Sequence, residues 1–452
     1  MKKAGMAEPA IASFGLHFDR LVRGERGTLS ESEIQPAPAL ADSERLAEHR
    51  ETGKSSLDKV VVIKLNGGLG TSMGLDRAKS LLPVRDGLSF LDIIARQTLA
   101  LREDTGVDIP LLFMNSFRTA EDAAATLRGY RDLAVADLPL GFLQSRVPKI
   151  IEADLSPAEH AENSELGWCP PGHGDLYTSI AGSGVLDLLL DHGIEYAFVS
   201  NADNLGAVFD PDLFGYMVDV GFEFLLEAAD RSRAVRKGGH LCRLADGRLA
   251  LRESAQCPAE DLEAFQNIER HRYFNSNNLW LHLPTLAEQL AEHGGFLPLA
   301  TLVNHKTLDP RDPDSPPVVQ LETAMGTAIS FFQRAAAVRV PRRRFSPVKN
   351  TNDLLGVRSD AFILTRDSRV VLHPDRIDPP VIRLDSRYFK LIDRFEDRFP
   401  NGPPSLLSCE RLQVEGDITF GSGVVVEGSA SVSADAPAKI EDGTTLSGQV
   451  GL

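Results

Sequence analysis

Apolar positions along the chain follow two different periods in turn. Mostly apolar runs, typical of strands buried on both faces of a sheet, occur at 60–63, 110–114, 196–199 and 222–226. Between these runs, patterns at 89–101 and 119–128 have helical spacing. Alternating strands and helices predict an α/β fold with a mostly parallel sheet and helices on both faces. Because such sheets bind ligands at the carboxyl ends of their strands, the residues that follow each strand are the candidates for chemistry.

The two ends of the chain have other patterns. Residues 1–50 are interpreted as an N-terminal accessory segment, in which Phe14, Phe18, Leu21 and Val22 have the spacing of a helix. The alternating pattern predicts one catalytic domain over residues 51–365. Residues 366–452 are then a linker and a small C-terminal domain, with the Pro-, Asp- and Arg-rich stretch 374–404 as the connection.

The C-terminal domain shows a six-residue period. Its apolar positions are Val414, Phe420, Val426 and Val432, and after a short insertion Ile440 and Leu446 resume the interval. Glycines lie nearby throughout this stretch. The pattern predicts a small left-handed parallel β-helix, with a set of antiparallel hairpins as the alternative.

Composition narrows the possible functions. The net charge of −16 argues against a general nucleic-acid binder, although it leaves room for a local basic pocket. Four cysteines without paired spacing suggest neither a disulfide framework nor a zinc site. No apolar run approaches the ~20 residues of a membrane span, and the N-terminus lacks a signal-like apolar stretch. We therefore expect a cytoplasmic protein without membrane or nucleic-acid partners.

A glycine-rich loop directly follows the first predicted strand. Gly67, Gly68, Gly70 and Gly74 lie within eight residues, and Lys79 follows shortly after. Small residues let the backbone approach a ligand closely and adopt positive φ. A Walker loop would need Gly where Ala78 stands, and a dinucleotide fingerprint would need one residue fewer between its glycines. A nucleotidyltransferase loop and a plain surface turn remain.

Ordered motifs along the whole chain favour the nucleotidyltransferase. From about Phe14 to the C-terminus, the sequence resembles the eukaryotic-type UTP–glucose-1-phosphate uridylyltransferase (UDP-glucose pyrophosphorylase) family. One local departure is Leu75-Asp76-Arg77-Ala78, where many members have Cys-Lys-Gly-Pro; it leaves Lys79 in place. The motifs that carry the resemblance are LNGGLGTSMG, AKSLL, FLDI, FMNSF, QSRVPKI, PPGHGDLY, VSNADNLGA, KGGHL, FNSNNLW, QLETAMG and FSPVKNTNDLL.

The resemblance implies a Rossmann-like (GT-A-like) domain that makes UDP-glucose and pyrophosphate from UTP and glucose 1-phosphate. The phosphate of the sugar is the nucleophile, and it is largely dianionic at neutral pH because its second pKa is ~6. No general base is needed, but two polyanions must be brought together by Mg²⁺ and lysines. Asp203, just after a predicted strand, is the expected Mg²⁺ ligand. Lys79 and Lys349 are the expected catalytic cations.

Binding roles carry over from the resemblance position by position. The residues expected at the nucleotide are Leu65, Asn66, Gly67, Gly68, Gln144, Gly172, Ser200, Asn201 and Asp203, with Gln144 and Gly172 at the uracil. Those expected at the sugar phosphate are His173, Lys237, Asn277 and Asn278. The basic run 342–344 receives no role beyond its proximity in sequence to Lys349.

Two other functions compete with this one. A related pyrophosphorylase could act on N-acetylglucosamine 1-phosphate or on many sugar 1-phosphates, because sugar choice depends on few hydroxyl contacts. A non-catalytic nucleotide-sugar sensor would be expected to lack a metal carboxylate or a lysine, whereas Asp203, Lys79 and Lys349 are all present.

A monomer or weak homodimer is expected for the assembly. The six-residue spacing breaks at 433–439, and Pro437 lacks the N–H that a pairing strand would offer.

Overall fold

The computed structural model describes residues 1–25, 27–75, 77–231, 238–312 and 314–452. Its main sheet has the order β2-β18-β12-β15-β11-β3-β6-β7, in which only β15 pairs antiparallel with its neighbours along this path. The predicted α/β class with a mostly parallel sheet is confirmed. The strands of this path are β2 (Ala41–Asp42), β18 (Ala335–Arg339), β12 (Phe224–Asp230), β15 (Tyr273–His282), β11 (Tyr196–Asn201), β3 (Val60–Asn66), β6 (Leu111–Asn115) and β7 (Gly141–Leu143).

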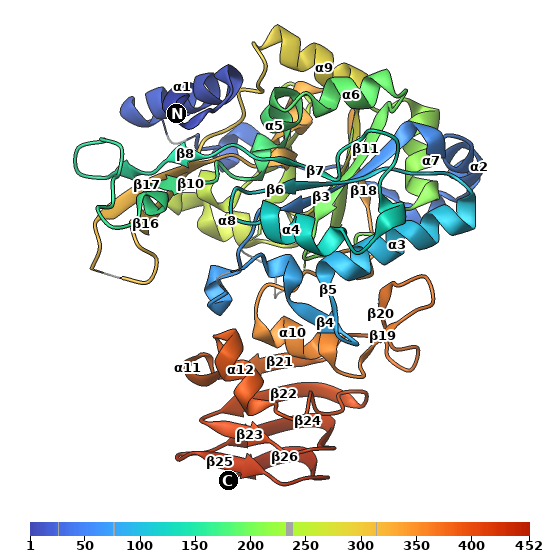
Figure 1. Ribbon diagram of the computed structural model, residues 1–452, viewed down its shortest axis with the longest axis vertical. Helices are drawn as coiled ribbons and strands as arrows, with labels where there is room; N and C mark the ends of the chain where they lie inside the picture. The colour runs from blue at the N-terminus through green and yellow to red at the C-terminus, as the bar shows by residue number, and fades with distance from the viewer. Residues whose placement is uncertain (26, 76, 232–237, 313) are drawn as a thin grey trace.

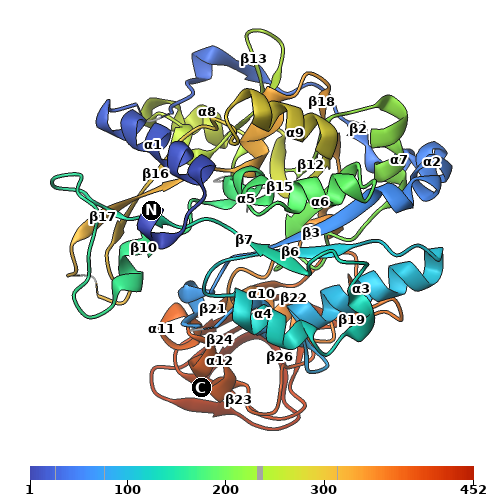
Figure 2. The same cartoon turned by 45° about the horizontal axis from the view of Figure 1, so that its top comes forward.

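Alternating side chains of the central strands build a separate core on each face. On β3, Val60 and Val62 point into one core, whereas Val61 and Ile63 point into the other. This is why the predicted strands are apolar without a break. Helices α5 (Leu176–Gly182), α6 (Val185–Asp191) and α9 (Leu283–Glu292) cover one face, and α3 (Phe90–Thr105) and α4 (Ala120–Leu127) cover the other (Figures 1 and 2).

The N-terminal segment packs against the catalytic part of the chain. Helix α1 (Glu8–Val22) places Phe14, Phe18 and Leu21 on a three-stranded sheet, whereas Val22 is exposed. That sheet consists of β16 (Leu302–Thr307), β17 (Pro317–Glu322) and β9 (Ile150–Ile151). Further on, β1 (Ile34–Pro36) pairs with β13 (His240–Leu244), which also pairs with β14 (Leu249–Arg252). The smaller elements here are α2 (Arg50–Ser55), α7 (Pro211–Val220), α8 (Leu262–Gln266), β4 (Pro83–Arg85), β5 (Leu88–Ser89), β8 (Val147–Pro148) and β10 (Trp168–Cys169).

The C-terminal region consists of stacked parallel ladders, which lie below the main sheet in Figure 1. One ladder has the order β21-β22-β24-β26, and a second pairs β23 with β25. Parallel pairing excludes the antiparallel hairpins considered above, and all six residues of the six-residue pattern are buried. The strands are β21 (Val381–Leu384), β22 (Cys409–Glu415), β23 (Ile418–Phe420), β24 (Val425–Ser433), β25 (Ala438–Ile440) and β26 (Thr445–Gly451).

The stretch 374–404 is more than a connection. It contributes β21 to the first ladder and carries the helices α11 (Ser386–Phe389) and α12 (Ile392–Arg398). Upstream of it lie α10 (Thr351–Arg358) and the hairpin of β19 (Phe362–Leu364) and β20 (Val370–Leu372). No helix in the described parts of the chain is long and apolar enough to cross a membrane.

Candidate active site

A cavity of about 280 Å³ lies at the carboxyl ends of β3, β6 and β11. It is where the sheet rule places a ligand site, because these parallel strands end at the same edge. Most of the predicted nucleotide residues meet here. The predicted residues that line the cavity are Leu65, Asn66, Gly67, Gly68, Lys79, Gln144, Gly172, His173, Asn201 and Asp203.

The glycine-rich loop folds tightly over one wall of this cavity. A Cβ atom on Gly67 would lie 2.8 Å from Nε2 of Gln144, so the glycine makes room for that amide. Gly70 has φ +69°, and a Cβ there would lie 2.7 Å from Cδ1 of Leu75. The backbone N–H of Lys79 donates to the carbonyl of Gly68 at 3.1 Å, which brings the lysine back to the start of the loop.

The opposite wall is built by the PPGHGD segment. Gly172 has φ +81°, and a Cβ there would lie 2.4 Å from the carbonyl oxygen of Thr323, so only glycine fits. Nδ1 of His173 accepts a hydrogen bond from the N–H of Met325 at 3.0 Å. Burial, with a further contribution from the charge of Lys349, lowers the pKa of His173 to about 4. The ring is therefore neutral at pH 7 with its proton on Nε2, as a hydrogen-bond donor.

Lys79 and Asp203 both line the cavity and form an ion pair there. Nζ of Lys79 lies 2.6 Å from Oδ2 of Asp203. The other oxygen of Asp203, Oδ1, is buried and has no hydrogen-bond partner among the residues that the structure describes. A buried carboxylate oxygen without a partner fits a divalent cation such as Mg²⁺. In the described ranges no three His, Cys, Asp or Glu side chains cluster for a metal, so such an ion would rely on water and ligand phosphates.

Lys349 approaches from a neighbouring segment rather than from the cavity wall. The N–H of Val348 donates to the carbonyl of Asp203 at 3.1 Å. Lys349 is the next residue after Val348, so its backbone lies close to the Asp203 loop. Asn350 caps helix α10, and the carboxylate of Asp353 accepts the N–H of Lys349 at 2.7 Å. Lys349 is exposed, so its side chain is available to a ligand at the mouth.

Three of the predicted residues lie elsewhere. Ser200 is fully buried, and its hydroxyl bonds to Nζ of Lys64 at 2.6 Å. Asn278 is fully buried too, and its amide donates to Glu227 at 3.0 Å and to the carbonyl of Arg344 at 3.2 Å. Asn277 belongs to a β-bulge of β15, has φ +58° and bonds to Asn275. Lys237, the remaining residue predicted at the sugar phosphate, lies outside the described residues.

Buried charges near the site escaped the sequence analysis. Lys64 donates to the hydroxyl of Ser200 and to the carbonyl of Ala207, and burial lowers its pKa to about 7. Its signal was a lysine inside the apolar run VVVIKL. Glu227 and Arg344 form a buried ion pair outside the cavity lining, and their sequence neighbourhoods gave no comparable signal. Ser80, Met114, Pro170 and Ala202 also line the cavity.

Comparisons with known proteins agree along nearly the whole chain. A family model described as "UTP--glucose-1-phosphate uridylyltransferase" matches residues 11–427. The protein of that name from Solanum tuberosum is 41% identical over 406 residues, covering 89% of this chain and 83% of the relative. The one from Saccharomyces cerevisiae is 39% identical over 439 residues, covering 96% and 86%.

Solved structures of similar proteins share the fold. A variant of the UDP-glucose pyrophosphorylase from Leishmania major in complex with UDP-glucose matches with a TM-score of 0.93 at 41% identity, covering 100% of this chain and 98% of that chain. The UDP-glucose phosphorylase from Trypanosoma brucei matches with a TM-score of 0.92 at 42% identity and the same coverage, 100% and 98%.

Proposed function

Because the chain belongs to the UTP–glucose-1-phosphate uridylyltransferase family, we propose that it forms UDP-glucose and pyrophosphate from UTP and glucose 1-phosphate. The observation that carries the proposal is the cavity at the ends of β3, β6 and β11. It brings together an amide, Gln144, a neutral imidazole, His173, and the Lys79–Asp203 pair. These are groups that can bind a base, a sugar phosphate and a polyphosphate side by side.

In the proposed reaction, an oxygen of the sugar phosphate forms a bond to the α-phosphorus of UTP. The bond from that phosphorus to the bridging oxygen breaks, and pyrophosphate leaves with its electron pair. The reverse reaction follows the same path. Because the nucleophile is already an anion, the site must supply positioning and positive charge rather than a base. Lys79, which lines the cavity, and Lys349, which is exposed beyond the residue bonded to Asp203, are the groups for that task.

Asp203 would hold Mg²⁺ through its unpartnered Oδ1. Bound there, the ion would offset the charge that accumulates on the phosphates during displacement. The Lys79 amine, which is paired with Oδ2 of Asp203 in the free protein, would then share its hydrogen bonds with the phosphates. Asp203 and Lys79 therefore act as one unit.

The remaining groups orient the two substrates. Gln144 is wedged beside Gly67 and can read the edge of the uracil with its amide, together with the backbone at Gly172. His173 can donate from Nε2 to an oxygen of the sugar phosphate without adding a charge, because it is neutral. Asn277 and Lys237 remain the proposed contacts to the sugar. The amide of Asn278 is already bonded within the core, which weakens its proposed role in sugar binding.

The test is a direct assay of the purified chain with UTP, glucose 1-phosphate and Mg²⁺. We expect stoichiometric release of pyrophosphate and formation of UDP-glucose, and loss of both when the divalent cation is removed. A panel of sugar 1-phosphates separates the narrow assignment from a broad UDP-sugar or UDP-N-acetylglucosamine pyrophosphorylase. Equal rates with galactose 1-phosphate would contradict the narrow assignment, and absence of pyrophosphate release would contradict the function itself.

We also propose the form of the C-terminal domain and the state of assembly. The parallel ladders at the C-terminus are proposed to form one left-handed β-helix domain, because their buried apolar residues recur every six residues on both sides of the break at 433–439. The protein is proposed to act as a monomer or a weak homodimer in the cytoplasm.

A further inference from the structure

A buried polar cluster surrounds Asn204, the residue that follows Asp203, and it lies outside the lining of the cavity. It consists of Asn204, Glu227, Asn278 and Arg344, which are 0–6% exposed. None of the four lines the cavity. Buried polar groups are costly unless they are hydrogen-bonded, and a buried network whose members are bonded to one another holds the segments that it connects in one arrangement.

Asn204 joins the two segments that carry the reactive groups. Its Nδ2 donates to the carbonyl of Arg344 at 3.0 Å, and its Oδ1 accepts the N–H of Ser346 at 3.0 Å. Its backbone forms a β-bridge with Pro347. One residue earlier, the carbonyl of Asp203 accepts the N–H of Val348. The side chain of Asn204 and the backbone of Asp203 and Asn204 thus bind the Asp203 loop to the segment that ends at Lys349.

Arg344, the partner of Asn204, is in turn bound to a strand of the main sheet. Arg344 donates to both oxygens of Glu227, at 2.8 and 2.6 Å. Glu227 also accepts from Trp280 at 3.1 Å and from Asn278 at 3.0 Å, so its carboxylate is fully satisfied. Replacing a buried ion pair by apolar residues is often neutral or stabilising, which makes such a pair weak evidence for stability. What this pair supplies is a fixed position for Arg344, and through its carbonyl for Asn204.

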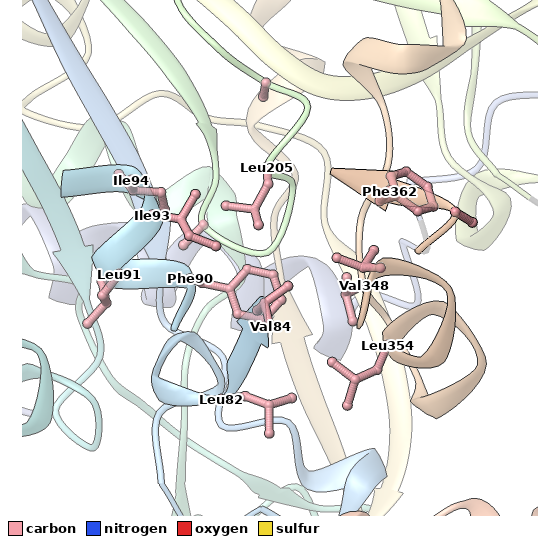
Figure 3. Packing of buried hydrophobic residues seen from close by; sticks show 14 of the residues in the cluster. Leu82, Val84, Phe90, Leu91, Ile93, Ile94, Leu205, Val348, Leu354 and Phe362 are labelled. Carbon is pink, nitrogen blue, oxygen red and sulfur yellow. The ribbon is translucent and has the colours of Figure 1, made fainter. Parts of the chain in front are cut away.

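Apolar packing holds the same segment from the other side. Val348 is 1% exposed and points into the core cluster between the sheet and α10. Figure 3 shows Val348 and Leu354 gathered with Val84, Phe90 and Leu205 in this cluster. The side chain before Lys349 is therefore held in the core, and the residue after it, Asn350, caps helix α10, whereas Lys349 itself is exposed.

We propose that Asn204 is a positioning residue that sets Lys349 at a fixed place relative to Asp203, and that the Glu227–Arg344 pair with Asn278 is its support. The inference rests on the proposed function, in which Asp203 and Lys349 act on the same phosphates. It gives Asn278 a role in support rather than in contact with the sugar, and it gives a role to Arg344, which the sequence analysis left without one.

The test is a double-mutant cycle with Asn204→Ala and Lys349→Ala. A displacement of ~1 Å can cost ~100-fold in rate, so we expect kcat of Asn204→Ala to fall about 100-fold while KM for UTP changes less than about threefold. In the Lys349→Ala background, the same substitution should change kcat by less than about twofold, because the group that it positions is already gone.

A second measurement does not depend on activity. Amide hydrogen exchange of Val348, whose N–H donates to Asp203, should be about tenfold faster or more in Asn204→Ala than in the wild type. If Asn204→Ala does not fold, Asn204→Ser takes its place, because a hydroxyl is too short to reach both Arg344 and Ser346.

The matched control is Arg102→Lys. Arg102 is buried and donates to the backbone carbonyls of Ile109, Asp132 and Leu133, at the amino-terminal side of β6. It should lower the melting temperature yet leave kcat and the exchange of Val348 unchanged.

Equal losses of kcat from Asn204→Ala with and without Lys349, or unchanged exchange of Val348, would overturn the proposal. If the wild type makes no UDP-glucose, the proposed function fails, and the exchange measurement still decides whether Asn204 fixes the segment.

Discussion

Asp203 has two carboxylate oxygens in different surroundings, one paired with Lys79 and one buried without a partner in the described part of the chain. That asymmetry is what a single-carboxylate Mg²⁺ site requires, since one oxygen must stay available. Asp203→Asn keeps the shape and removes the charge. We expect kcat to fall on the order of 100-fold or more, because the displaced phosphates lose their cation.

The measurement is kcat for pyrophosphate release over a range of Mg²⁺ concentrations. Asp246→Asn is the control, because Asp246 forms an exposed pair with Arg248. Near-normal kcat for Asp203→Asn at saturating Mg²⁺ would remove Asp203 from the metal site.

The two lysines lie in different places, so we expect their alanine variants to affect kcat and UTP binding differently. Lys79 lines the cavity, whereas Lys349 is exposed just before the N-cap of α10 and is not part of the lining. Lys349→Ala should lower kcat about 100-fold and change the Kd for UTP less than about threefold, because its charge matters most during displacement. Lys79→Ala should weaken both. The test is to measure UTP binding by calorimetry and kcat by assay for each variant. The control is Lys439→Ala, because Lys439 is exposed. Loss of UTP binding in Lys349→Ala would assign Lys349 to ground-state binding.

At the scale of elements, the glycine loop after β3 is shaped by the side chain above it. A Cβ on Gly67 would meet the amide end of Gln144, which can move aside, so Gly67→Ala should fold. The displaced amide would lose its contact with the base, and we expect KM for UTP to rise about tenfold, the equivalent of ~1.4 kcal/mol. Gly15→Ala on α1, where a Cβ has open space, is the control. An unchanged KM in Gly67→Ala would show that Gln144 does not read the base from this position.

Elements also explain which parts of the site the sequence could predict. Gly67 and Asp203 come just beyond strands, where the sheet rule groups them, and Lys79 follows the same glycine loop. His173 was placed at the site only by the resemblance of the motif PPGHGD to the family. Asn278 stands equally close to a motif, yet a β-bulge turns it into the core against Glu227, 51 residues away. Pairings of that kind depend on tertiary contacts that no local pattern encodes.

On the scale of the whole molecule, β26 is the last strand of the larger C-terminal ladder and pairs with β24 alone among the described strands. Its outer edge could in principle recruit a second chain. The edge is short, however, and its residues are mostly small, polar and exposed, with Leu452 as the large apolar side chain at this end. Such an edge buries little apolar area, whereas a stable interface buries about 1,200–2,000 Å².

We therefore expect a monomer or a weak dimer whose activity does not depend on contacts between C-terminal domains. Light scattering at micromolar protein is the measurement, combined with kcat per chain over a tenfold range of concentration. A chain that ends after residue 451 is the matched variant, because it removes only the exposed Leu452. The mass in solution and the specific activity should be the same for the full chain and for the shortened chain. A stable octamer, or a specific activity that rises with protein concentration, would contradict this prediction and indicate an interface on this edge.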